Sequence, residues 1–244
     1  MRCGWPQIPR PAPCSTPLPA FTQAALTAGW SRELLDDWFS GCAAALSRFD
    51  KDRLKATPAN RMQLLPGLLQ AVDELFQALS LRGPDGEATL KALIDQLLAQ
   101  PVLYPPERLA AVVRSAGAVA DHWPPGLPLR QQVVGALRAA LAEPERTASD
   151  HRLRRIEWIC RCVDCAGMIA WAESPRADPL VMAMAEPRRQ HVQSRIEAAG
   201  APLTVAILKQ GSPHKLVLRK PHDLLEQDRT ERRRQAQDLA IAQG

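Results

Sequence analysis

Two cysteines about two-thirds of the way along the chain have a spacing that suits metal binding. Cys162 and Cys165 form a C-x2-C pair, and this spacing lets both thiolates reach one tetrahedral Zn²⁺ ion from a tight turn. A closed structural site needs two further ligands, and His191 and His214 are the candidates that follow in the chain. The sequence therefore predicts a structural zinc site formed by Cys162, Cys165, His191 and His214.

The same cysteines admit other interpretations. The intervals from Cys165 to His191 and from His191 to His214 are 26 and 23 residues, and neither matches the compact spacing of a two-histidine zinc finger. Cys160 lies two residues before Cys162, so several pairings are open. Reduced thiols packed in the core are one alternative. A redox-active dithiol is another, although no βαβ pattern of the thioredoxin type precedes these cysteines.

Common catalytic motifs are missing from the sequence. It contains no G-x-x-x-x-G-K-[ST] loop, no G-x-G-x-x-G, no H-E-x-x-H and no G-x-S-x-G, so the usual nucleotide-binding, metalloprotease and serine-hydrolase templates do not apply. We therefore expect a non-enzymatic protein that interacts with a protein partner, and we assign no catalytic or cofactor-binding residue. The enzymatic alternative is a site that joins His191 and His214 to Cys162 or Cys165.

The net charge of +5 belongs to the C-terminal part of the chain. Residues 1–150 contain 15 basic and 15 acidic residues, whereas residues 151–244 contain 16 basic and 11 acidic residues together with four of the five histidines. An excess of this size is compatible with an acidic partner but does not require one.

A basic run lies in the polar tail of the chain. Its members are Arg229, Arg232, Arg233 and Arg234. Such a run can contact the phosphates of nucleic acid, so nucleic-acid binding through the C-terminal part is the second functional hypothesis. Acidic residues interleave with these arginines, and mixed charges at helical spacing are also typical of a solvated helix.

Apolar residues recur every three or four positions over most of the chain, which predicts amphipathic helices. Ser31 is the expected N-cap of the first helix, and Gly200 is the expected stop of the seventh. The predicted helices cover about 31–46, 61–79, 90–98, 105–119, 129–141, 151–159, 187–199 and 223–242. Segments 203–208 and 215–218, with a turn at 210–213, predict one β-hairpin.

These elements indicate a mainly α protein. We expect an irregular helical bundle or a short HEAT-like array of helix pairs, followed by a small α+β module that contains the hairpin. The predicted division is a proline-rich leader over 1–20, a helical scaffold over 21–147 and a basic C-terminal module over 148–244. The sequence contains no secretory signal and no apolar run of about 18 residues, so we expect a cytoplasmic protein without a membrane span.

Residues 157–220 contain a C-x-x-C turn, an R-x-H segment and a G-S-P-H-x-L-V stretch followed by lysine. The residues concerned are Cys162, Cys165, Arg189, His191, Gly211, Ser212, Pro213, His214, Leu216, Val217 and Lys220. This order resembles the C-terminal region of large uncharacterised bacterial and fungal proteins, some of which are similar to 2-oxoglutarate/Fe(II) oxygenases near their other end. The resemblance covers about a quarter of the chain. It implies an accessory region of an oxygenase-type multidomain enzyme. The oxygenase chemistry itself does not carry over, because no histidine here is followed two positions later by the carboxylate that the iron-binding facial triad needs.

Overall fold

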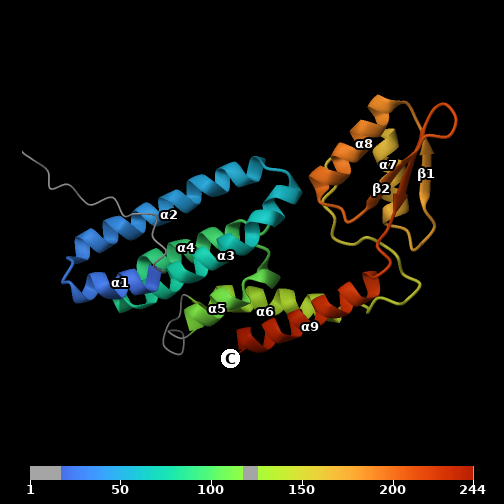
Figure 1. Ribbon diagram of the computed structural model, residues 1–244. Helices are drawn as coiled ribbons and strands as arrows, with labels where there is room; N and C mark the ends of the chain where they lie inside the picture. Colours follow the sequence, from blue (N-terminus) through green and yellow to red (C-terminus); the bar gives the residue numbers. More distant parts are fainter. Residues whose placement is uncertain (1–17, 118–125, 244) are drawn as a thin grey trace, which may run out of the picture.

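The computed structural model describes residues 18–117 and 126–243. Over these residues the protein is mostly helical, with a small three-stranded antiparallel sheet near the C-terminus (Figure 1), so the predicted fold class is confirmed. The helices of the first part are α1 (Leu18–Thr27), α2 (Arg32–Lys55), α3 (Pro58–Ser80), α4 (Glu87–Ala99), α5 (Ala110–Gly117) and α6 (Leu127–Ala142). The C-terminal part adds α7 (Val163–Ala172), β1 (Leu180–Ala183), α8 (Glu186–Ala199), β2 (Thr204–Leu208), β3 (Lys215–Arg219) and α9 (Leu224–Gln243).

The first helices begin where local sequence signals place them. The hydroxyl of Ser31 accepts the Leu34 main-chain N–H at 3.3 Å, which confirms it as the N-cap of α2. The α3 helix begins at Pro58 with Thr57 as its cap, three residues before the predicted start. Residues 1–17 of the predicted leader lie outside the described residues, as does the predicted helix end near 118–125. Residues 18–20 of that leader belong to α1, which the sequence analysis did not predict.

A continuous apolar core joins α2, α3, α4, α5 and α6. Its fully buried members include Phe39, Phe76, Leu79, Leu97, Leu129 and Leu137. One carboxylate also lies in this core: Asp50 is 3% exposed and accepts hydrogen bonds from Tyr104 Oη and Gln96 Nε2, both at 2.7 Å. Two donors from different segments satisfy this buried acid, as a buried charge requires, so α2 is tied to α4 and to the turn that follows α4.

The C-terminal module has a separate core between its sheet and its helices. The strand order is β1-β3-β2, and β2 with β3 forms the predicted hairpin, in which Ala206 lies opposite Val217. The first strand, β1, pairs with the other edge of β3 and was not predicted from the sequence. Leu216 and Leu218 point from β3 toward α7 and α8, where Met168 and Val192 are completely buried.

The helix predicted through Leu153, Ile156 and Ile159 is wrong. This segment is extended, and from residue 154 to residue 160 half-buried and exposed positions alternate. Ile156, Trp158 and Cys160 pack against the C-terminal core, while Ile159 is 41% exposed. Burial therefore alternates with the period of two of an extended segment, and not with the helical spacing of three to four residues that the sequence predicted. The reason is that alternate side chains of this segment pack against the C-terminal core.

The last helix returns from the C-terminal module to the helical part (Figure 1). It packs against α6 and α5, and the Arg130 guanidinium of α6 donates to the Ala242 main-chain oxygen at 2.8 Å. The two parts also meet where α8 ends: Gly200 has φ +65°, and a Cβ atom there would lie 3.3 Å from Ala59 of α3. Glycine at this C-cap therefore meets both a left-handed backbone and a close helix contact, as its predicted role as a stop required.

Among residues 18–117 and 126–243, no helix combines the length and the apolar character that crossing a membrane would need.

A buried lysine joins the end of the sheet to the end of α7. Lys220 Nζ donates to the main-chain oxygens of Ser174 at 2.7 Å and Arg176 at 3.0 Å, and it lies 4.8 Å from the centre of the Trp171 ring. We expect Lys220→Met to lower the free energy of unfolding by roughly 1–3 kcal/mol, because two main-chain acceptors and an aromatic face lose the buried cation. Urea unfolding measures this change. Lys215→Met, at an exposed position, should change the same free energy by less than about 0.5 kcal/mol, and equal losses in both variants would contradict the assignment.

Candidate metal centre

Four metal-ligating side chains converge in the C-terminal module: Cys160, Cys162, Cys165 and His191. Their ligand atoms all lie within 4.8 Å of one another. His191 Nε2 is 3.5 Å from the Cys160 sulfur, 3.4 Å from the Cys162 sulfur and 3.5 Å from the Cys165 sulfur. Zn–S bonds of about 2.3 Å and a Zn–N bond of about 2.0–2.1 Å give a tetrahedron whose sulfur-to-nitrogen edges are about 3.5 Å. The four atoms therefore have the spacing of a tetrahedral ligand set and can hold a metal ion.

Three separate pieces of backbone supply these ligands. The extended segment before α7 turns Cys160 inward, because every second residue of that segment packs on the core. Cys162 is the N-cap of α7, and Cys165 follows in the first turn, where it is completely buried. His191 comes from the second turn of α8, which packs against α7. The site thus closes the junction between the extended segment and two helices.

His214 is not part of this group, and Cys160 takes the place that the sequence analysis gave to it. His214 ends the hairpin loop, where its main-chain oxygen accepts hydrogen bonds from the Met184 N–H at 3.3 Å and from the Arg189 guanidinium at 3.5 Å. These bonds hold residue 214 at the end of the sheet next to β1 and β3, whereas the four ligands meet where α7 begins. The structure therefore brings together three of the four predicted ligands and supplies the fourth from another segment.

The sequence contained a signal for Cys160 that the helical interpretation concealed. Cys160 and Cys162 are separated by one residue, so they point to the same side of an extended strand but lie about 200° apart on a helix. Only the extended conformation, followed by the reversal of the chain into α7, lets both sulfurs approach one point. Tertiary packing decides between these conformations, because the apolar residues of 153–159 fit either period.

An ion pair beside the ligands joins the same two helices. The Arg188 Nε donates to Asp164 Oδ2 at 2.8 Å, and its Nη2 donates to Asp164 Oδ1, which makes the pair bidentate. Asp164 lies between the two cysteines of the C-x2-C pair, and Arg188 lies one turn before His191. The guanidinium holds the pKa of Asp164 below its ordinary value, mainly through these hydrogen bonds. The pair orients the starts of α7 and α8 so that their ligands face each other.

The pKa values of the two thiols in the C-x2-C pair are shifted in opposite directions. The main-chain N–H of Cys165 is the principal cause that lowers the pKa of exposed Cys162 to about 7, as expected for a thiol at a helix N-terminus. Burial is the principal cause that raises the pKa of Cys165 to about 12. Cys162 is therefore the thiol that ionises most readily, whereas Cys165 needs the charge of a bound cation to ionise near neutral pH.

The arginine run lies on α9, and every member has an intramolecular partner. The partners are Glu226 for Arg229 and Arg233, the main-chain oxygens of Leu141 and Glu143 for Arg232, and Glu231 with Asp238 for Arg234. Nucleic-acid contact through these arginines stays a prediction. Their local pairing reduces the charge that they present to a polyanion.

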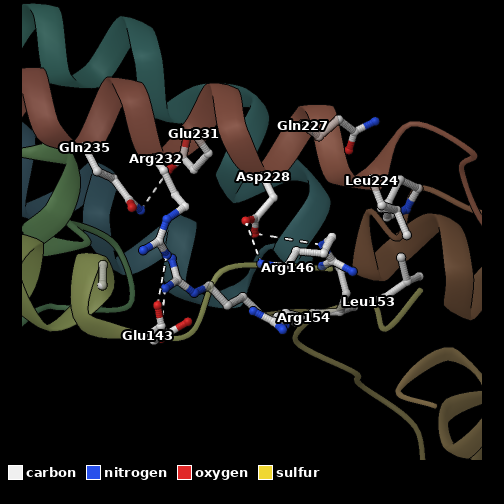
Figure 2. A pocket seen from close by; sticks show the side chains of 14 residues that line it. Glu143, Arg146, Leu153, Arg154, Leu224, Gln227, Asp228, Glu231, Arg232 and Gln235 are labelled. Carbon is white, nitrogen blue, oxygen red and sulfur yellow. Dashed lines mark hydrogen bonds and ion pairs between the residues drawn. The ribbon is translucent and has the colours of Figure 1, made fainter. Parts of the chain in front are cut away.

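A cavity of about 230 Å³ lies where the C-terminal module meets α6 and α9. Figure 2 shows Arg146 turned toward Asp228 on one side of it: the Arg146 main-chain N–H donates to Asp228 Oδ2 at 3.5 Å, and its guanidinium lies 3.9 Å from Oδ1. On the opposite wall Arg232 reaches the main-chain oxygen of Glu143 at 3.1 Å. Both contacts join α9 to the segment that follows α6, so the walls of the cavity connect these two parts of the chain.

Comparisons with protein-family models, with curated proteins and with solved structures find no match. The resemblance to the C-terminal region of oxygenase-related proteins is therefore neither supported nor opposed by them, and an accessory role in such an enzyme stays an expectation.

The two histidines provide a matched test of the ligand set. We expect His191→Ala to weaken Zn²⁺ affinity by more than about 100-fold, because removing a direct ligand should exceed the roughly 10–100-fold loss that removal of an outer partner causes. His214→Ala should leave the affinity within about threefold of the unchanged protein. Competition with a chromogenic zinc chelator measures both affinities. The ligand assignment fails if His214→Ala has the larger effect.

Proposed function

We propose that Cys160, Cys162, Cys165 and His191 hold one structural Zn²⁺ ion, and that the chain is a zinc-stabilised interaction protein. The observation that carries this proposal is the set of three nearly equal sulfur-to-nitrogen distances, 3.4–3.5 Å, around His191 Nε2. Thiolate and imidazole ligands in a tetrahedral arrangement favour Zn²⁺ among the common divalent ions.

A metal ion explains the convergence better than packed thiols do. One neutral imidazole nitrogen accepts one hydrogen bond well, yet three sulfurs lie at hydrogen-bonding distance from it. Without an ion, two of the three thiols would therefore lack an acceptor there. With an ion, all three sulfurs become ligands, and the positive charge of the ion offsets the repulsion between the thiolates.

The ligand set is also closed, which favours a structural role over a catalytic one. Catalytic zinc sites usually keep three protein ligands and leave the fourth position to water or substrate, whereas this cluster offers four protein ligands. Zinc binding contributes about 10–16 kcal/mol of apparent folding free energy in zinc-finger peptides. Here it would fasten the extended segment and α7 to α8, and α8 in turn contacts α3.

The helical part supports a role in protein interaction. Four large apolar side chains around the turn between α2 and α3 are more than 40% exposed: Phe49, Leu54, Met62 and Leu64. Large apolar side chains that remain exposed are available for contact with a protein partner. A protein that binds this region is therefore the partner class that we propose for the helical scaffold.

Metal analysis of the purified chain tests the zinc proposal. After expression in zinc-replete medium we expect about one zinc ion per chain. Cys160→Ser should lose most of this zinc and lower the midpoint of thermal unfolding, whereas Cys42→Ser, at a half-buried cysteine of α2 outside the cluster, should keep it. Elemental analysis and calorimetry on the same samples give both readings.

Two outcomes would overturn the zinc proposal. One is a content below about a tenth of a zinc ion per chain in folded, reduced protein. The other is a reversible disulfide between Cys162 and Cys165 in protein that contains no metal, detected by thiol titration before and after reduction. That result would assign the C-x2-C pair to redox chemistry instead.

A further inference from the structure

A long stretch of the C-terminal module contains basic residues and no acidic ones. Residues 198–222 include Lys209, Lys215, Arg219 and Lys220 but neither aspartate nor glutamate. This stretch forms the whole β2–β3 hairpin. The tail over 223–243 differs, because its four arginines are accompanied by five carboxylates. Most of the unbalanced positive charge of the module therefore lies on the hairpin stretch, and none of it on α9.

Two of these cations follow each other on one face of the central strand. Leu216 and Leu218 of β3 point into the module core, so Lys215 and Arg219 project from the opposite face. Both are exposed. The strand register pairs Lys215 with Ala183 and Leu208, and Arg219 with Thr204. Neither cation therefore has an acidic neighbour across the sheet.

Two further exposed cations lie near the two ends of β3. Lys209 directly follows β2 in the hairpin loop and is exposed. Arg176 is exposed beside the other end of β3, because its main-chain oxygen accepts a hydrogen bond from Lys220 at 3.0 Å. Among the residues that the structure describes, none of the side chains of Arg176, Lys209, Lys215 and Arg219 forms an ion pair.

Two acidic residues on neighbouring segments form ion pairs with arginines outside the hairpin. Glu157 of the extended segment binds Arg61 of α3, and Asp164 of α7 binds Arg188 of α8. None of the four cations Arg176, Lys209, Lys215 and Arg219, here called the hairpin cation row, pairs with either of these carboxylates. Unpaired cations at the surface attract a polyanion more strongly than paired ones.

We propose that the hairpin cation row binds the phosphate backbone of duplex nucleic acid. Lys215 and Arg219 are four residues apart on an extended strand, which separates their Cα atoms by about 13 Å. This separation is close to the width of about 12 Å of the major groove of B-DNA, so the two side chains can reach phosphates on the two sides of the groove. A duplex also presents one phosphate charge for about every 1.7 Å of its axis, so Lys215 and Arg219 can each meet a phosphate.

A duplex fits this surface better than a single strand does. Sequence-tolerant binding of single strands depends on aromatic side chains that stack with the bases. The segment 198–222 contains no phenylalanine, tyrosine or tryptophan. Contacts to the phosphates of a regular helix need only cations at a fixed spacing, and a β-strand supplies such a spacing.

Fluorescence anisotropy with a labelled duplex DNA, titrated with the full-length chain at several salt concentrations, tests the proposal. We expect Lys215→Gln/Arg219→Gln to weaken binding at least about tenfold at low salt and to reduce the slope of log K against log salt by about two. Arg229→Gln/Arg233→Gln removes the same charge from α9 and is the matched control. It should change affinity less than about threefold, because Glu226 already neutralises part of that charge.

The other outcomes overturn the proposal. Equal weakening by both double variants would show attraction by net charge alone. No duplex binding at low salt would remove the activity altogether, and binding to vesicles that contain phosphatidylserine but not to duplex would reassign the row to membranes. Circular dichroism and zinc content verify that each variant is folded. If the strand variant loses its fold, Lys209→Gln and Arg176→Gln replace it, since both lie outside the strands, and each should lower the slope by about one.

Discussion

Three cysteine sulfurs within 3.5 Å of a single imidazole nitrogen are the constraint on which the C-terminal module depends. The arrangement is possible only because an extended segment, the start of α7 and the middle of α8 meet at one point. The neighbouring contacts hold these three segments in position. The ion pair between Asp164 and Arg188 aligns the two helices, and the apolar core below them fixes the direction of the extended segment.

The position of α9 explains how this module is held to the helical part. The last helix leaves the sheet and packs along α6 and α5, so its Ala242 joins the core of the first helices. At the other side, α8 ends on α3 through the close contact between Gly200 and Ala59. Any change at the cysteine–histidine cluster that moves α8 is therefore felt at the start of α3.

Electrostatic pairing distinguishes two kinds of basic surface in the same module. On α9, arginines and carboxylates alternate at helical spacing and neutralise one another. On the β2–β3 hairpin, cations stand on a strand whose cross-strand neighbours are alanine, leucine and threonine. Counting charges along the sequence gives both regions a similar number of basic residues. Only the number of carboxylates within reach of each cation separates a solvated helix from a surface that can attract phosphate.

The sequence by itself determined the mainly helical class, the N-cap at Ser31, the stop at Gly200 and the hairpin, because each depends on local periodicity or on the conformational preference of one residue. It also placed Cys162, Cys165 and His191 in one candidate site, since the C-x2-C spacing indicates a metal-binding turn and His191 is one of the histidines that follow it in the chain. Tertiary structure alone decided that Cys160 and not His214 completes the cluster. The residues between 153 and 160 fit a helix or a strand equally well, and only packing against a core assembled from distant segments selected the extended form that carries Cys160 inward.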